Sequence, residues 1–376
     1  MAPRSLPPRS WGSRPGTPAR CYDPVVTEQV LTTRALNRAL LARQLLLERS
    51  TLPVAAALEQ IGGIQDQYAP SGYIGLWSRL RTFALDDLTR SLEARTVIQA
   101  TLMRSTIHLV SAPDYVLLAA GIRRWRREWW ARTRARDLTG VDMDRAAKVG
   151  RTFLAGGPRR QAEIVAHLAG RGFPKVAWDG LGLWIDLVRV PPSGTWSRRR
   201  ADLYGLADDW IDAPDPGEEA GLEHVVRRYL GGFGPAAAVD IASLAGLPPA
   251  VVKPIVERLD LRRFRDESGR ELFDVDGAPL PDADTPAPVR FLPTWDANLL
   301  VHARRTLVMP ERYRPIIFST KAPQSFPTFL VDGAVAGTWR FESGRVELSP
   351  LEELPPDAIE ELGREAEGLA AFHESG

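Results

Sequence analysis

The order of elements between residues 216 and 278 constrains the fold of this chain more than any other feature. Apolar residues at helical spacing predict three helices, at 221–230, 236–245 and 249–259. Runs rich in β-formers on either side of a glycine turn predict a hairpin, at 261–264 and 271–275. Helix, helix, turn, helix and hairpin is the order of a winged-helix domain, which we therefore expect here.

Two earlier stretches repeat this order with additional helices. The first is predicted to contain helices, the earliest of them capped by Thr33, at 33–47, 53–61, 71–80 and 85–93. It closes on a strand predicted over Thr101–Val110. A long basic helix at 113–137 leads into the second stretch, whose helices are expected at 143–154, 161–169 and 178–187. Residues 187–203, with Pro191-Pro192-Ser193-Gly194 at the turn, have the pattern of a wing.

The region after residue 278 has a different character. A proline-rich linker at 279–288 precedes short predicted strands, at 289–292, 306–309, 328–331, 334–340 and 344–348. Asp332-Gly333 is a hairpin signal, and an acidic helix is expected at 355–373. The fold class that we predict is α+β, with tandem winged-helix domains plus a small C-terminal β-barrel. The expected units are a disordered extension, three winged helices and the barrel with its helix, at 1–26, 27–137, 138–215, 216–278 and 279–376.

Several missing patterns exclude whole classes of site. Cys21 is the single cysteine, and the five histidines show no metal-ligand spacing, so we expect no disulfide framework, no metal and no cofactor. No apolar run approaches the roughly 20 residues of a membrane span. Residues 1–25 lack the apolar core of a secretory signal. These observations predict a cytoplasmic protein without a membrane partner.

The net charge of +1 conceals an uneven distribution of charge. Residues 121–136 carry seven arginines against the single acid Glu128, whereas acidic side chains dominate residues 352–374. A basic stripe of this kind is typical of a protein that binds a polyanion. The alternative is that these arginines form the solvated face of a long helix. On the same helix, the tryptophan group is expected to pack in a core rather than stack on nucleic acid: Trp125, Trp129 and Trp130.

A glutamine motif, Gln65-Asp66-Gln67, follows a pair of glycines. Glutamine does not titrate, but its amide both accepts and donates hydrogen bonds and can hold a water molecule. If the segment is extended, Gln65 and Gln67 share a face and Asp66 points away; on a helix the two glutamines would diverge by about 200°. The alternative is a polar loop that caps the next helix. Asp66 itself is interpreted as a helix cap or a surface acid. The alternative is that Asp66 acts as a general base.

Four blocks of sequence resemble the AlkZ/YcaQ family of bacterial winged-helix DNA glycosylases. They are Gly62-Gly63-Ile64-Gln65-Asp66-Gln67, Met103-Arg104-Ser105-Thr106-Ile107-His108-Leu109-Val110, Tyr229-Leu230-Gly231-Gly232-Phe233-Gly234-Pro235, and the C-terminal pair Leu292-Pro293-Thr294-Trp295-Asp296-Ala297-Asn298-Leu299-Leu300 with Phe329-Leu330-Val331-Asp332-Gly333. The resemblance implies a channel for duplex DNA and excision of N7-alkylated purines. Some members unhook interstrand crosslinks made by an antibiotic and so protect its producer. Asp66 departs from the family pattern, which usually has an apolar residue between the two glutamines.

The resemblance also implies roles for individual residues. Gln65 and Gln67 match the catalytic motif and are expected to place the hydrolytic water. Independently of the resemblance, Arg104, Thr106 and His108 share one face if their strand is regular, and contacts with DNA are expected from these three residues and from Arg198, Arg199 and Asp296. For Arg104, Thr106 and His108 the alternative is a polar patch packed on the first helix, and for Asp296 it is the cap of a turn. We expect a monomeric, monofunctional DNA glycosylase whose partner is double-stranded DNA with alkylated purines. The other hypotheses are a non-catalytic winged-helix transcriptional regulator and a protein–protein scaffold.

Overall fold

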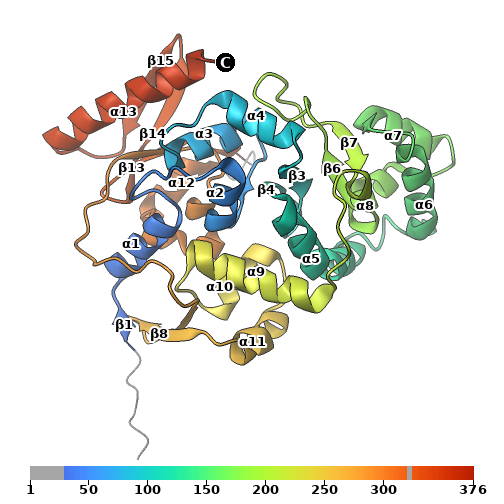
Figure 1. Cartoon of the computed structure of the whole chain (residues 1–376), viewed down its shortest axis with the longest axis horizontal. Helices are drawn as coiled ribbons and strands as arrows, with labels where there is room; N and C mark the ends of the chain where they lie inside the picture. The colour runs from blue at the N-terminus through green and yellow to red at the C-terminus, as the bar shows by residue number, and fades with distance from the viewer. Residues whose placement is uncertain (1–28, 320–323) are drawn as a thin grey trace, which may run out of the picture.

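The structure is a computed structural model that describes residues 29–319 and 324–376 (Figure 1). The predicted extension at 1–26 lies outside the described residues. The first part of the described chain contains β1 (Val30–Leu31), α1 (Thr33–Arg43), α2 (Val54–Ile61), β2 (Ile64–Gln65), α3 (Pro70–Arg79), α4 (Leu85–Glu93), β3 (Val97–Thr101), β4 (Ile107–Ser111) and α5 (Ala112–Thr133). The second contains α6 (Met143–Leu154), β5 (Arg159–Arg160), α7 (Gln161–Ala169), α8 (Lys175–Trp184), β6 (Leu187–Arg189) and β7 (Leu203–Leu206).

The order predicted for residues 216–278 is confirmed. The elements are α9 (Glu218–Phe233), α10 (Ala238–Ala245), α11 (Pro249–Arg258), β8 (Arg262–Asp266) and β9 (Glu271–Asp274). Gly246 ends α10 with φ 72°, in the left-handed region where glycine carries no Cβ penalty. The hairpin gains a third strand from the start of the described chain, because β1 pairs in parallel with β8. A segment of the first predicted unit thus completes the sheet of the third.

A six-stranded sheet joins the first and second predicted units. Its strand order is β2-β4-β3-β6-β7-β5, and every neighbouring pair is antiparallel. At the centre, Ala100 of β3 lies opposite Val188 of β6, and both are buried. The division into separate domains stays a prediction. The pairing of β3 with β6 joins strands from the two sides of the predicted boundary at 137/138.

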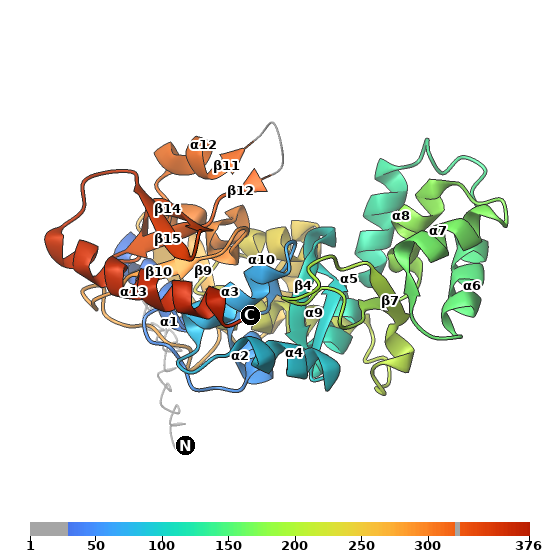
Figure 2. The same ribbon diagram turned by 90° about the horizontal axis from the view of Figure 1, so that it is seen from above.

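The C-terminal region forms an open sheet where a barrel was predicted. Its strands are β10 (Arg290–Leu292), β13 (Thr328–Val331), β14 (Ala334–Glu342) and β15 (Arg345–Pro350), in that order, and the two outer strands do not pair with each other. The helix α13 (Pro356–Glu374) packs along β15, with its apolar side buried. The smaller elements α12 (Arg314–Ile317), β11 (Phe318–Ser319) and β12 (Gln324–Ser325) stand beside this sheet (Figure 2).

Some predicted boundaries are wrong for local reasons. The first helix is capped by Thr32, whose hydroxyl accepts from Ala35 N–H at 3.1 Å, and it ends at Arg43. Helix α8 starts at Lys175 because Pro174 occupies the cap position, three residues before the predicted start. The strand predicted at 306–309 is a 3-10 turn instead, since an apolar run alone does not distinguish a strand from another buried segment.

Three large apolar cores hold these elements together. One lies between α5, α9, α10, α11 and the centre of the six-stranded sheet, and a second lies under α2, α3, α4 and the C-terminal sheet. The third belongs to the lobe of α6, α7 and α8, which stands to one side in Figure 2. In the described part of the chain, no helix is both long and apolar enough to cross a bilayer.

Helices α5 and α9 cross at a pair of glycines. A Cβ on Gly121 would lie 2.5 Å from the carbonyl carbon of Gly221, and a Cβ on Gly221 would lie 2.3 Å from the Gly121 nitrogen. Both contacts are with backbone, which cannot turn aside as a long side chain can. The two helices therefore approach closely only because both positions lack a side chain.

A fully buried ion pair ties α1 to β9. The guanidinium of Arg43 donates to the two carboxylate oxygens of Asp274 at 2.6 and 2.8 Å, and neither side chain is exposed. The carbonyls of Leu230 and Pro279 accept the remaining hydrogen bonds of Arg43, at 2.8 to 3.0 Å. All five guanidinium N–H groups thus have an acceptor, which is the condition under which a buried charge is tolerated.

Candidate functional site

The chain turns sharply between α2 and the glutamine motif. Gly62 ends the helix with φ 77°, and Gly63 follows with φ 83°. A Cβ on Gly63 would lie 2.9 Å from a side-chain carbon of Val110 on β4. The glycine pair is required by both the backbone angles and this close approach, and it delivers the motif onto the edge of β4.

The carbonyl oxygens of both motif glutamines are held by donors. Gln65 lies opposite His108 in the β2–β4 pairing, is 6% exposed, and accepts a hydrogen bond from Arg104 Nη2. Gln67 is exposed, and its Oε1 accepts from the backbone N–H of Ile107 at 2.9 Å. Because an amide oxygen has two lone pairs, each glutamine can still accept a hydrogen bond from water.

The segment that carries the motif is extended through Gln65 and Asp66 and bends at Gln67 and Tyr68. The backbone N–H of Asp66 donates to Ile107 O at 2.8 Å, so pairing with β4 continues past Gln65 into the middle of the motif. Alternate residues of an extended segment share a face. The backbone is therefore not helical at Gln65 and Asp66, while the shared face and the joint action of Gln65 and Gln67 stay predictions.

The single strand predicted over 101–110 is wrong. A 3-10 turn at Met103–Ser105 separates β3 from β4, and Arg104 lies in this turn with φ 52°, in the left-handed region. Arg104 therefore does not share a strand face with Thr106 and His108. The hydroxyl of Thr106 donates back to the turn backbone at 3.0 Å. The predicted contacts of these three residues with DNA stay predictions.

Arg104 connects the glutamine motif to α10. Besides its bond to Gln65, Arg104 donates from Nη1 to the carbonyl of Leu244 in the last turn of that helix, at 3.1 Å. Burial lowers the pKa of Arg104 to about 10, which leaves the guanidinium charged at neutral pH. A cation is favoured at the C-terminal end of a helix. The motif thus has a fixed positive charge directly behind Gln65.

Two buried histidines near Arg104 are neutral. Burial and the charge of Arg104 lower the pKa of His108 to about 3, and burial, Arg104 and His108 together hold the pKa of His302 well below its usual value. The Nδ1 of His108 lies 3.0 Å from Thr106 O, which can only accept, so this nitrogen carries the proton. At neutral pH neither imidazole is a cationic proton donor.

Asp66 is buried behind the motif. Its carboxylate accepts from Gln99 Nε2 at 2.6 Å and from the Gly72 N–H, in the first turn of α3, at 3.0 Å. The predicted helix cap is confirmed, whereas a surface acid is wrong, because the side chain is 2% exposed. Burial raises the pKa of Asp66 to about 7, although both hydrogen bonds oppose the shift.

The raised pKa of Asp66 makes folding stability depend on pH. The folded-state pKa lies above that of a free aspartate, near 4, so the stabilising effect of the neutral form is present below about pH 4 and is lost as the pH rises through about 7. Asp66→Asn removes this titration in a group of almost the same shape. We expect the free energy of unfolding of the variant, relative to the parent protein, to rise by up to about 4 kcal/mol between pH 4 and pH 8.

This prediction is checked by urea unfolding of both proteins at several pH values. Asp282→Asn is the matched control, since Asp282 lies exposed in the proline-rich linker and should leave the pH profile unchanged. Parallel profiles for Asp66→Asn and the parent protein would show that Asp66 does not titrate in this range.

The wing-like loop between β6 and β7 is attached to the motif at two points. Gln99, which holds Asp66, also donates to the carbonyl of Gly194, where a Cβ would lie 2.2 Å from Gln99 Oε1. Arg199 donates to the hydroxyl of Tyr68, the residue after the motif, at 2.8 Å. Arg198 is exposed and forms no ion pair with the residues that the structure describes. The loop therefore presents positive charge beside Gln67.

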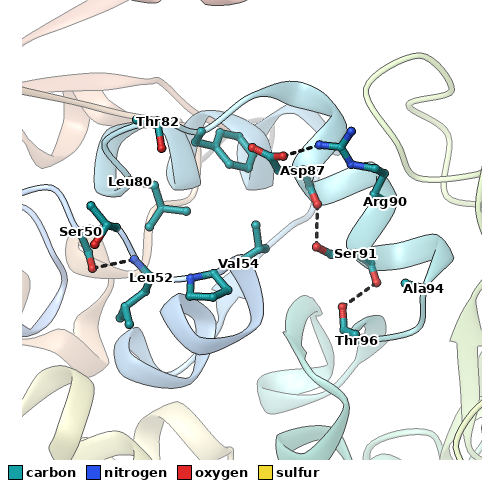
Figure 3. Close-up of a pocket in the computed structure, with 13 residues that line it drawn as sticks. Ser50, Leu52, Val54, Leu80, Thr82, Asp87, Arg90, Ser91, Ala94 and Thr96 are labelled. Atoms are coloured by element: carbon teal, nitrogen blue, oxygen red, sulfur yellow. Dashed lines mark hydrogen bonds and ion pairs between the residues drawn. The ribbon is translucent and has the colours of Figure 1, made fainter.

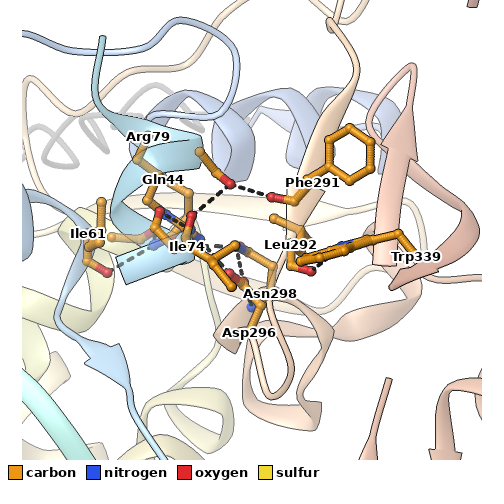
Figure 4. Close-up of polar contacts among 12 residues, drawn as sticks. Gln44, Ile61, Ile74, Arg79, Phe291, Leu292, Asp296, Asn298 and Trp339 are labelled. Carbon is orange, nitrogen blue, oxygen red and sulfur yellow. Dashed lines mark hydrogen bonds and ion pairs between the residues drawn. The ribbon is translucent and has the colours of Figure 1, made fainter. Parts of the chain in front are cut away.

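Asp296 lies in a buried polar network between α3 and the C-terminal sheet (Figure 4). It accepts from Arg79 Nη2 at 2.9 Å and from the backbone and side chain of Asn298 at 3.0 and 2.8 Å. With both carboxylate oxygens engaged and 6% of the residue exposed, the predicted turn cap is confirmed. A contact with DNA stays a prediction and would require this network to open.

Two of the arginines on the basic helix α5 are paired with acids elsewhere in the protein. Arg123 pairs with Asp186 at 2.7 Å and with Asp215 at 2.9 Å, and Arg124 pairs with Glu218 at 2.6 Å. Arg126, Arg127 and Arg132 have no ion-pair partner among the described residues, and Arg126 is also only 8% exposed. The number of unpaired positive charges on this helix is therefore smaller than its number of arginines.

Comparison with known proteins shows the family of this chain. The family model described as "DNA glycosylase AlkZ-like" matches residues 58–372. The chain therefore belongs to the AlkZ-like family of DNA glycosylases, which confirms the resemblance found in the sequence. No curated protein sequence matches the chain.

Among solved structures, the chain is similar to the Streptomyces sahachiroi DNA glycosylase AlkZ. The TM-score is 0.77 at 18% sequence identity, and the match covers 92% of this chain and 98% of that chain. At this identity the likeness shows a shared fold.

Proposed function

We propose that this protein hydrolyses the N-glycosidic bond of N7-alkylated purines in duplex DNA. The observation that carries the proposal is the fixation of both motif glutamines, Gln65 by Arg104 and Gln67 by the Ile107 N–H. Alkylation at N7 makes the purine a cationic leaving group, so strong protonation of the base is not needed. What remains is to place a water at C1′ and to stabilise positive charge on the sugar.

The two glutamines would act on this water in different ways. The charge of Arg104 draws electron density from Gln65 Oε1 and strengthens the Gln65 amide as a donor, here to a lone pair of the water. The oxygen of Gln67 meets only a neutral N–H and keeps its capacity to accept a proton of the water. A water held in this way points its second lone pair at the sugar. Asp66 supports the motif through Gln99 and α3 and is not needed as the base.

Two further features support hydrolysis by water and binding of DNA. A glycosylase that also cleaves the strand uses an amine, but the described lysines, Lys148, Lys175 and Lys253, are exposed on α6, α8 and α11, away from the motif. Arg199, which donates to the Tyr68 hydroxyl, and Arg198, which precedes it on the wing-like loop, would contact phosphates. We infer that the helix-and-hairpin units act as winged helices on duplex DNA, and that the protein works as a cytoplasmic monomer.

The direct test is base release from duplex DNA that carries N7-methylguanine. The proposal predicts free N7-methylguanine and an alkali-labile abasic site, with affinity for DNA that falls as salt rises. A second duplex with an N7-linked interstrand crosslink tests whether crosslinks are unhooked as well. Binding to one defined operator without release would favour a transcriptional regulator. Failure to bind either DNA at low salt would favour a protein–protein scaffold.

A further inference from the structure

A pocket of about 470 Å³ lies where the end of α5 meets α8 and the six-stranded sheet. Thr101, at the end of β3, and Ser105, the last residue of the Arg104 turn, are part of the lining, so the pocket lies close to the glutamine motif without including it. Its volume falls in the range of small-molecule sites. A second hollow, between α2 and α4, differs because its polar groups bond among themselves, as the contacts of Asp87 and Ser91 show (Figure 3).

Two nearly buried arginines line the pocket at the end of α5 without full use of their donors. Arg126 and Arg189 are each 8% exposed. Nε and Nη2 of Arg126 and Nε of Arg189 are buried and have no hydrogen-bond partner among the described residues. Arg189 Nη2 donates to the Thr101 hydroxyl at 3.1 Å. Buried donors of a charged group are costly to leave unpaired, so a ligand that supplies acceptors would be favoured here.

The charge around this pocket selects an anion. Burial lowers the pKa of Arg126 to about 10 and also lowers that of Arg189, yet a pKa of about 10 keeps Arg126 charged at neutral pH. Asp186, the acid that most favours the charge of Arg126, is already bound by Arg123 at 2.7 Å. The one acid in the lining, Asp179, pairs with Lys175 at 2.7 Å. The pocket is therefore positive, and guanidinium groups match the oxygens of a phosphate.

Aromatic rings form another part of the lining. Trp129 on α5 is 49% exposed, and Trp178 on α8 meets Tyr204 on β7 edge to face with ring centroids 5.1 Å apart. The guanidinium of Arg189 lies over the Tyr204 ring at 5.2 Å. An exposed indole beside unpaired cations is an arrangement on which a nucleobase stacks while its phosphate is bound.

We propose that this pocket binds a nucleoside monophosphate unit, with the phosphate on Arg126 and Arg189 and the base against Trp129 and Trp178. The unit can be a free nucleotide or one nucleotide of a DNA strand, since the recognised chemistry is the same. The proposal does not require glycosidic activity, because binding alone tests it.

Calorimetric titration of the full chain with four probes tests the proposal: dGMP, deoxyguanosine, deoxyribose 5-phosphate and inorganic phosphate. We expect dGMP to bind at least about 10-fold more tightly than deoxyguanosine or deoxyribose 5-phosphate. Trp129→Ala should weaken dGMP about 10-fold and leave deoxyribose 5-phosphate unchanged, since Trp129 is exposed and its loss should not disturb the fold. Arg189→Gln should weaken both dGMP and deoxyribose 5-phosphate. Arg132→Ala, an exposed change on the same helix, is the control that should alter neither.

Competition with unmodified duplex DNA distinguishes the two sources. Displacement of dGMP by the duplex shows that a nucleotide of the strand enters the pocket, and simultaneous binding assigns it to a free nucleotide. Equal affinity for dGMP and its fragments, or an unchanged dGMP affinity in Trp129→Ala, would overturn the proposal. Base release from N7-methylguanine DNA is measured separately, so the failure of either proposal leaves the other standing.

Discussion

Replacing Gln65 and Gln67 together with alanine should lower the rate of N7-methylguanine release by at least about 100-fold. Alanine can neither accept nor donate through its side chain, so the water would lose both partners. Affinity for the duplex should stay within about threefold of the parent protein, because contacts with phosphates dominate binding. The measurement is single-turnover release, together with fluorescence anisotropy on the same duplex.

The single variants separate chemistry from folding. Gln67 is exposed, so Gln67→Ala should lose activity without a change in stability. Gln65 is buried against Arg104, so Gln65→Met, which keeps its volume, is the better probe there. Gln60→Ala on α2 is the matched control and should leave release unchanged. A double variant that released base at the parent rate would remove the motif from the mechanism.

Breaking the buried pair of Arg43 and Asp274 should have the largest effect on stability. Asp274→Asn leaves the guanidinium charge buried without its counter-ion, and we expect a loss of about 3–5 kcal/mol in the free energy of unfolding. Urea unfolding followed by circular dichroism measures this loss. Hydrogen exchange should show the weakening first in α1 and β9, which the pair connects.

A variant of an exposed ion pair and a double variant of the buried pair serve as controls for this prediction. Glu347→Gln breaks the exposed pair with Arg340 and should cost less than about 1 kcal/mol. Arg43→Met combined with Asp274→Leu removes both charges and should recover most of the stability that Asp274→Asn loses. An effect of Asp274→Asn no larger than that of Glu347→Gln would show that the buried charge is accommodated in another way.

Local patterns predicted the helices with regular spacing and clear ends. The bounds of α4, α6 and α7 are those expected from apolar periodicity, and the element order of residues 216–278 is also as expected. An extended and a helical form of the glutamine motif were both considered, and the backbone is extended through Gln65 and Asp66. These features depend on a few neighbouring residues, which is why a single sequence contains them.

Features that depend on distant partners could not be predicted in this way. Arg104 was expected on a strand, but its contacts with Gln65 and α10 place it in a turn with a left-handed backbone. No spacing signal links Gln99 to Asp66 or His302 to Arg104, so neither residue could be predicted as part of the site. The strands of the C-terminal region were mostly placed correctly, yet their failure to close depends on pairing that turn signals do not specify.

The sheet shared by the first two helical units has a mechanical consequence for the DNA. Hydrogen bonds between β3 and β6 make a continuous sheet from β2, which carries the glutamine motif, to β5 at the base of the α6–α8 lobe, and this pairing opposes a hinge at the seam. A duplex that is to meet both ends of the sheet must supply the deformation itself. The energy of that bend depends on the stiffness of the base steps around the lesion. Lesions in flexible sequence should therefore be reached more readily than identical lesions in stiff sequence.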